Sequence, residues 1–173
     1  MEQPDRHELL NSIRSFSLPR YDEIPNVGLY LEQTSKYLNE YLGCLGDCGL
    51  TGSMISNYVK MGLISNPVKK QYNREQIGYL FFIAIAKSVL SMDDIRLLIQ
   101  MQRNAYDSRK AYEYFRLELE NVLFYVFGLK DALDTVGNDR THTKNMLRTI
   151  IIAAAHKVYL NHYFTALRLE KGE

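Results

Sequence analysis

The sequence is poor in cysteine and has no long apolar run, and both shortages limit what the protein can be. Only two cysteines are present, Cys44 and Cys48. They form no disulfide framework, and the four histidines do not complete a four-ligand zinc site with them. No apolar run approaches the roughly 18 residues of a membrane span, and MEQPDRHELL lacks the layout of a signal peptide. We expect a cytoplasmic protein with reduced thiols and without metal or cofactor; a redox role of the thiols is the alternative.

An excess of charge is also missing. The 21 Lys and Arg residues against 20 Asp and Glu leave a net charge of +1, which excludes binding to nucleic acid through bulk positive charge. Any basic site must therefore be local. Apolar residues make up 46% of the 173 residues, which is ordinary for a globular chain and enough for one domain, or for a small domain with an appended helical bundle.

Catalytic motifs are absent as well. The glycine-rich stretch GCLGDCGLTG lacks the Gly-Lys-Ser/Thr ending of a phosphate-binding loop. His156 and His162 are six residues apart, so they lie on nearly different faces of one helix. No serine has a recognisable base partner, and the acidic residues are scattered. We therefore expect a protein that is not an enzyme.

Apolar spacing predicts helices throughout, because period-two alternation of β-branched residues is missing. Proline and glycine separate the helical segments, and ISNPVKKQYN is long enough for a small hairpin or wing. The glycines of GCLGDCG predict a turn before the third helix. The expected helices cover about residues 5–17, 27–42, 51–61, 77–89, 91–100, 105–128 and 141–169.

One short helix, in LTGSMISNYVKMGLI, carries a distinctive polar face. Thr51 is a good N-cap, and Leu50 and Ile55 are spaced as a hydrophobic staple. Gly62 is suited to the position that ends the helix. The face opposite the apolar one carries hydrogen-bonding groups and no acid, at the spacing i, i+3, i+4 and i+7: Ser53, Ser56, Asn57 and Lys60.

The region around this helix is locally basic. Between Thr51 and Arg74 the chain has four basic residues and no acidic one, a local charge of +4 in a protein whose total is +1. A turn, a helix with an acid-free polar face and a loop with paired lysines are the parts of a helix-turn-helix, whose second helix enters the major groove. Lys69, Lys70 and Arg74 would then contact phosphates. The alternative is a polar face that is simply solvated.

Two stretches also resemble known families. MISNYVKMGLI, followed by PVKKQYNREQIGYLFFIAIAKSVLSMDDIRLLI, is similar to the DNA-binding half of MerR-type regulators over about residues 50–99. The matching positions are Tyr58, Gly62, Leu63, Lys70 and Tyr72. Ser56 stands where that family has an arginine, the wing is shorter, and the turn before the recognition helix is longer. Together, LYLEQ, NYVKMGLI and PVKKQYNREQIGYL resemble a bacterial domain-of-unknown-function family for which a MerR-like helix-turn-helix has been proposed.

The resemblance and the residues together predict an all-α fold in three segments. Residues 1–26 would form an N-terminal helix and linker, residues 27–100 a MerR-like winged helix-turn-helix, and residues 101–173 a helical region for dimerisation or effector binding. The expected partner is DNA, in a homodimer formed by the C-terminal helices; no motif supports a small-molecule effector. The alternative function is a protein-interaction module that keeps the helix-turn-helix fold without binding DNA. The predicted DNA-binding residues are Thr51, Ser53, Ser56, Asn57, Tyr58, Lys60, Lys69, Lys70, Tyr72 and Arg74.

Overall fold

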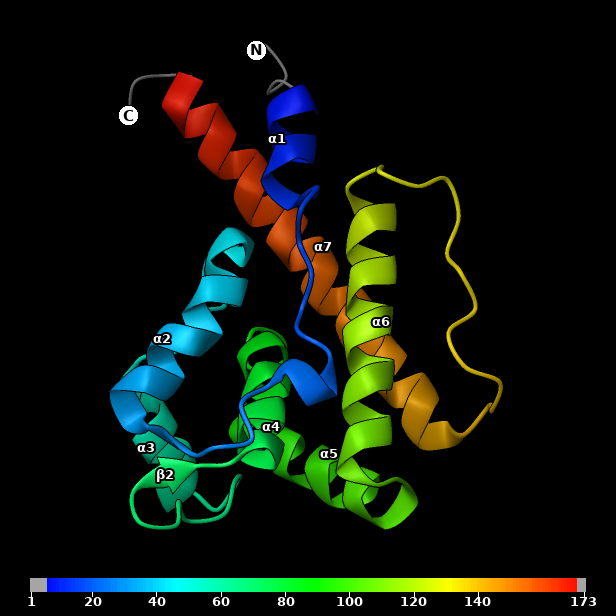
Figure 1. The fold of residues 1–173 in the computed structure, drawn as a ribbon. Coiled ribbons are helices and arrows are strands. Elements are labelled where there is room, and N and C mark those ends of the chain that lie inside the picture. The colour runs from blue at the N-terminus through cyan, green and yellow to red at the C-terminus, as the bar shows by residue number, and fades with distance from the viewer. Residues whose placement is uncertain (1–5, 171–173) are drawn as a thin grey trace.

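The computed structural model describes residues 6–170, and these are mostly helical (Figure 1). This confirms the expected all-α class. Residues 1–5 and 171–173, which belong to the first and last predicted segments, lie outside the described residues. The elements, including two short 3-10 helices η1 and η2, are α1 (Arg6–Ile13), η1 (Tyr21–Glu23), β1 (Leu29–Tyr30), α2 (Leu31–Leu42), η2 (Gly43–Leu45), α3 (Gly52–Lys60), β2 (Gln71–Tyr72), α4 (Arg74–Ala86), α5 (Met92–Ala105), α6 (Ser108–Val126) and α7 (His142–Glu170).

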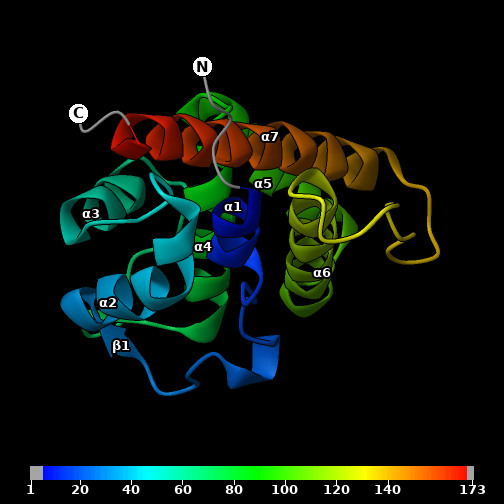
Figure 2. The same cartoon turned by 90° about the horizontal axis from the view of Figure 1, so that it is seen from above.

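Helix α4 lies at the centre of the molecule, where it packs against α2, α6 and α7 (Figure 2). Ten of its 13 residues are buried, because it is apolar around its whole circumference. A single hydrophobic cluster extends from Ile13 in α1 to Val158 in α7. The three predicted segments therefore share one core, and α6 and α7 pack along each other beside it.

Side-chain caps begin α3, α4 and α5, and the first of them is the predicted cap Thr51. Thr51 Oγ1 accepts a hydrogen bond from the Met54 amide at 3.2 Å. Asn73 Oδ1 accepts one from the Gln76 amide at 2.9 Å, and Ser91 Oγ accepts one from the Asp94 amide at 3.1 Å. Each cap satisfies an amide that has no partner within its helix, so the caps define where α3, α4 and α5 begin.

A small antiparallel pair of strands lies beside the candidate site. β1 pairs with β2, with Leu29 opposite Tyr72 and Tyr30 opposite Gln71. The helix expected from residue 27 therefore begins only at Leu31, because the preceding residues are strand. Gly28 permits this pairing, since a Cβ there would lie 2.5 Å from the Cβ of Gln71. The short period-two segments were too brief to be recognised in the sequence.

Within the described chain, none of the helices combines the length and the apolar character that a membrane span requires.

Candidate nucleic-acid interface

Helix α2 fixes the start of α3 through the backbone of Leu50. Asn39 Nδ2 donates to the Leu50 carbonyl at 2.9 Å, and the Leu50 amide donates to Asn39 Oδ1 at 2.8 Å. Ser35 Oγ donates to the same carbonyl at 2.7 Å. Leu50 and Ile55 are both buried, as the predicted staple requires. The turn between α2 and α3 is therefore held rigidly despite its glycines.

The other end of α3 is fixed equally well. Gly62 adopts φ 72°, and the Leu63 amide donates to the Tyr58 carbonyl at 3.0 Å, which is the Schellman ending that glycine favours. Arg96 of α5 donates from Nη2 to the Met61 carbonyl at 2.7 Å. The predicted end of the helix at Gly62 is confirmed, and α3 is anchored to the core at both ends.

The exposed face of α3 carries the polar residues of the predicted stripe. Ser53, Asn57 and Lys60 are exposed, whereas Ser56 is half-buried. Asn57 Nδ2 lies 3.4 Å from Met61 Sδ, a weak acceptor, so its amide can still bind a ligand. The hydroxyl of Thr51 is occupied by capping. The middle and the C-terminal half of α3 therefore present the available groups.

One acid lies beside this face although the sequence of α3 contains none. Glu32 of α2 places Oε1 3.1 Å from the position that a Cβ on Gly52 would occupy. A carboxylate is stabilised there by the partial positive charge of the helix N-terminus. The same carboxylate would repel a phosphate, so any DNA backbone contact at α3 must avoid its first turn.

The loop before β2 is a two-residue hairpin turn with two lysines at its tip. The Gln71 amide donates to the Val68 carbonyl at 2.9 Å, and Lys69 and Lys70 have φ values of 51° and 64°. Positive φ at both central positions is the mark of a type I′ turn, which strongly prefers Asn-Gly. Each lysine therefore carries a backbone cost of about 1–2 kcal/mol. Both side chains are exposed.

Two predicted contact residues lie in the core. Tyr58 and Tyr72 are each only 4% exposed, because Tyr58 is on the inward face of α3 and Tyr72 is in β2 beneath the hairpin. Burial raises the pKa of both phenols. The expectation that these rings face a DNA groove is therefore corrected: they support the site from inside.

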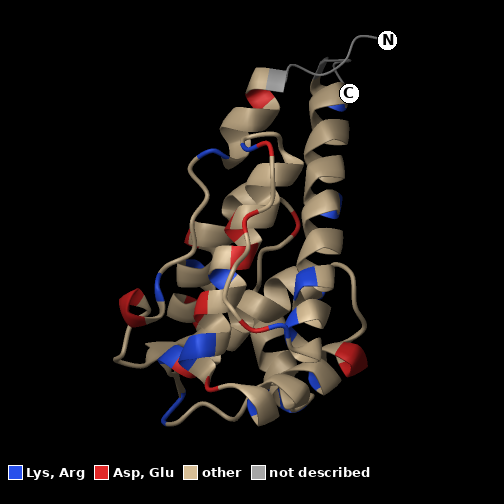
Figure 3. Ribbon diagram, turned by 90° about the vertical axis from the view of Figure 1, so that its right-hand side faces the viewer, with Lys and Arg blue, Asp and Glu red and all other residues tan. Residues whose placement is uncertain are grey.

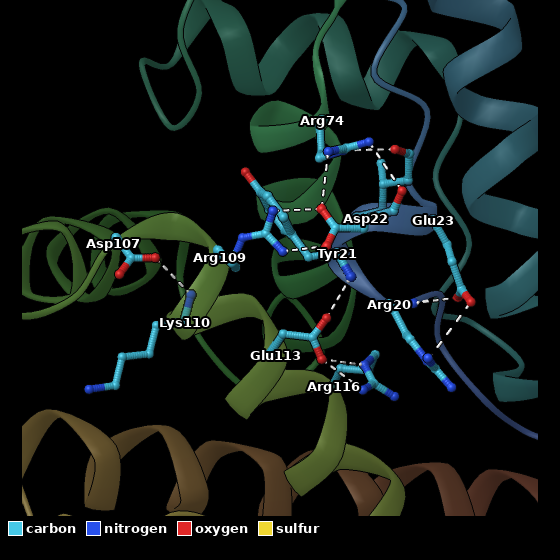
Figure 4. Close-up of polar contacts among 11 residues, drawn as sticks. Arg20, Tyr21, Asp22, Glu23, Arg74, Asp107, Arg109, Lys110, Glu113 and Arg116 are labelled. Carbon is cyan, nitrogen blue, oxygen red and sulfur yellow. Dashed lines mark hydrogen bonds and ion pairs between the residues drawn. The ribbon is translucent and has the colours of Figure 1, made fainter.

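Arg74 is also bound internally (Figure 4). Its Nε donates to the Ile24 carbonyl at 2.8 Å and its Nη2 to the Asp22 carbonyl at 3.1 Å. Arg109 of α6 holds the Asp22 carboxylate with both terminal nitrogens, and this hydrogen bonding lowers the pKa of Asp22. Arg74 therefore joins α4 to the N-terminal segment and α6, which corrects its assignment as a phosphate contact.

Without Arg74, the accessible basic residues of the predicted site are Lys60, Lys69 and Lys70. The local charge available to a ligand is then +3 rather than +4. Figure 3 shows Lys and Arg interspersed with Asp and Glu along the ribbon on the side of α6 and of the loop that follows it, away from the candidate site. Any attraction of an anion to the candidate site must come from these three lysines.

The comparisons identify a family but not an activity. A family model described as Domain of unknown function (DUF1836) matches residues 19–115, which is more than half of the 173 residues. The chain belongs to this family. The DUF1836 match includes α2, α3, the hairpin, α4 and α5, and it ends within α6. No curated protein and no solved structure matches the chain.

The two cysteines lie at the edge of the DUF1836 core, not in the candidate site. Cys48 is buried and Cys44 half-buried. Burial raises the pKa of Cys48 to about 11 and also raises that of Cys44, so both thiols stay protonated at neutral pH. Over residues 6–170, no cluster of three His, Cys, Asp or Glu side chains could hold a metal ion.

Asn39, Arg96 and Glu32 shape the site but were not recognised in the sequence. Asn39 and Arg96 bind backbone groups 11 and 35 residues away. Backbone partners leave no sequence motif, and neither residue lies on the polar stripe. Only the close packing of α2 and α3 brings Glu32 to the first turn of α3.

Proposed function

We propose that the protein is a cytoplasmic, non-enzymatic transcriptional regulator that binds DNA through α3 and the adjacent hairpin. The observation that carries the proposal is the turn at Lys69 and Lys70. Two exposed lysines occupy backbone conformations that glycine or asparagine would adopt at lower cost. Strain of this kind is common where a side chain is needed for function, and lysine at a loop tip is suited to phosphate.

The order of the elements supports a MerR-like winged helix-turn-helix. A short strand, two helices, a hairpin and two further helices follow one another from β1 to α5. Figure 1 shows α2, α3 and β2 together at one end of the molecule. Pairing of β2 with β1 ties the hairpin to the start of α2, so α3 and the wing would keep a fixed relative position on a duplex.

The proposed contacts are divided by residue type. Lys69 and Lys70 would bind phosphates on one side of the groove and Lys60 on the other, which sets the register without specifying sequence. Asn57, exposed in the middle of α3, can donate to and accept from a base edge, and an asparagine amide matches adenine. Ser53, whose hydroxyl lies 3.0 Å from Thr51 Oγ1 in the first turn, and half-buried Ser56 would contribute less.

A homodimer through α7 would complete the proposed regulator. Leu160 and Phe164, four residues apart on α7, are 50% and 51% exposed, so they lie on one face of the helix. Apolar side chains exposed together favour a protein partner, and a two-fold protein matches a two-fold DNA site. Replacing Leu160 and Phe164 with serine should shift the sedimentation of the protein from dimer to monomer; an unchanged dimer would remove α7 as its interface.

Selection of bound sequences from a random duplex pool by the purified protein tests the proposed function. We expect a recurrent half-site, and Asn57→Ala should change the preferred base at one position of it. Asn145→Ala, which removes an exposed amide from α7 instead, is the matched control and should leave the half-site unchanged. Failure to enrich any sequence, or equal weakening on all sequences by Asn57→Ala, would argue against base recognition by α3.

A protein-interaction module is the second candidate function, and one observation favours it. Val68, beside the two lysines, is 72% exposed, and Val27 and Tyr30 at β1 are exposed as well. Apolar side chains at a strand edge can bind a partner chain. This alternative predicts no salt-dependent affinity for duplex DNA at physiological ionic strength.

A further inference from the structure

An apolar cavity of about 270 Å³ lies between α4, α5, α6 and the first turns of α7. Its walls are mainly aromatic and aliphatic. Tyr79 and Phe82 come from α4, Leu98 from α5, Phe115 from α6 and Leu147 from α7. Phe82 and Phe115 meet edge to face with their ring centres 5.7 Å apart, an arrangement that leaves ring faces and edges available to a further aromatic ring.

Several polar groups around the cavity have partners among the lining residues. Tyr79 donates its hydroxyl to Gln102 at 2.8 Å. Lys144 Nζ donates to Asp139 at 2.8 Å, and Tyr106 also donates to Asp139. The charged lining residues are three acids, Glu75, Glu113 and Asp139, and two lysines, Lys110 and Lys144, a net charge of 2 − 3 = −1. Lys144 is paired with Asp139, whereas Lys110 is exposed and its Nζ lies over the Tyr106 ring, 5.1 Å from the ring centre. An anion buried among the apolar side chains would therefore lose its hydration without gaining a buried cation, which costs free energy.

Helix α7 reaches the cavity only at its beginning, through Lys144 and Leu147. Its other end lies near α1, where Ser12 Oγ is 3.0 Å from His162 Nδ1.

A loop between α6 and α7 closes one side of the cavity with Val136, Gly137 and Asp139. Gly137 has φ 73°, and any Cβ there would collide with Nζ of Lys144. Asn121 holds the loop upstream, because its amide group makes two hydrogen bonds, of 3.0 and 2.9 Å, with the Asp134 backbone. The loop between α6 and α7 therefore packs closely against Lys144 at the edge of the cavity, and the cavity itself remains unfilled.

We propose that this cavity is a binding site for a neutral, mainly apolar aromatic molecule of one or two rings. A dry cavity of about 150 Å³ lined by Leu, Ile and Phe accepts benzene, so the larger volume here fits a two-ring molecule. Pockets for small molecules are generally apolar with a few polar groups at their edge. The inference rests on the cavity alone and is independent of the proposed DNA binding.

Titration of the full chain with 2-naphthol, followed by the fluorescence of the probe and without DNA, tests the site. We expect saturable binding of one molecule per chain, and weaker binding of naphthalene-2-sulfonate because of its charge. Ala111→Leu places a larger side chain in the lining of the cavity, where it would collide with a bound ring. We therefore expect the affinity for 2-naphthol to fall at least tenfold, which corresponds to about 1.4 kcal/mol. Ala153→Leu, on the exposed side of α7, is the matched control and should bind like the wild type.

Circular dichroism establishes that each variant is folded, and Leu147→Phe replaces Ala111→Leu if the latter does not fold. The proposal is overturned if 2-naphthol does not saturate the wild type, or if the cavity variant and the control bind it equally. Tighter binding of the sulfonate than of 2-naphthol would overturn the assignment to a neutral ligand.

Discussion

Replacing Lys70 with glycine should stabilise the protein while weakening its binding to DNA. Lys70 has φ 64° at the second central position of the hairpin turn, where glycine is the preferred residue. Removing the left-handed strain gains about 1–2 kcal/mol, and the greater freedom of glycine in the unfolded chain takes back about 0.5–1 kcal/mol. We therefore expect a net gain of roughly 0.5–1 kcal/mol in the free energy of unfolding.

The loss of DNA affinity follows from the charge that is removed. Each lysine that neutralises a phosphate contributes about 0.9 to the slope of log affinity against log salt concentration. The slope should therefore become shallower by about 0.9 per protomer, in a fluorescence-anisotropy titration at several salt concentrations. Urea denaturation followed by circular dichroism measures the accompanying change in stability.

Lys36→Gly is the control for this experiment. Lys36 is exposed in the middle of α2, where glycine should cost about 1 kcal/mol because the backbone is helical. The same substitution thus has opposite effects on stability at the two positions. A Lys70→Gly variant that is less stable than the wild type would contradict the strained turn, and an unchanged salt slope would contradict the phosphate contact.

Three further predictions concern residues outside the turn. Arg74→Ala should lower the free energy of unfolding by about 1–3 kcal/mol, because the buried Ile24 carbonyl loses its donor, and should leave the salt slope unchanged; a shallower slope would restore Arg74 as a phosphate contact. Burial lowers the pKa of His162, so the unfolded state binds a proton first and stability falls as the pH drops below about 6.5. His162→Gln should reduce this loss between pH 7.5 and 5 in urea titrations, whereas equal losses would refute the assignment. Cys48 should resist a maleimide at pH 8 in the folded protein and react in urea, as detected by mass spectrometry; rapid labelling of the folded protein would show that the thiol is accessible.

The sequence was sufficient to predict the helices and their local signals. Thr51, Asn73 and Ser91 begin helices because a capping side chain acts within three residues. Gly62 ends α3 for an equally local reason. Signals that are contained within one helical turn can be recognised without knowing the fold.

The role of Arg74 depends on distant partners, and it could not be predicted in the same way. Arg74 is close in sequence to the paired lysines, but its guanidinium binds Asp22 and Ile24, about 50 residues earlier. Tyr72 also follows these lysines, yet its ring is buried. Tyr58 differs, because it lies three residues after the buried Ile55 and helical spacing alone places it on the inward face of α3.

The cavity and the strained turn also lie beyond what the sequence alone shows. ISNPVKKQYN contains no Asn-Gly or Asp-Gly pair at the tip, so it lacks the usual signal of a two-residue hairpin. The cavity is formed by residues from four helices and a loop, each of which is an ordinary core residue in its own segment. The cavity exists only because of the way these helices and the loop pack together.

The salt dependence of affinity for a selected duplex tests the central claim most directly. If Lys60, Lys69 and Lys70 each neutralise one phosphate, a dimer should show a slope of about −5 in log affinity against log salt concentration. Lys69→Ala with Lys70→Ala should bring it to about −2, whereas Lys110→Ala with Lys157→Ala, which removes the same charge from α6 and α7, should leave it unchanged. Equal slopes for the two double variants, or no measurable affinity for any duplex, would contradict DNA binding by α3 and the hairpin.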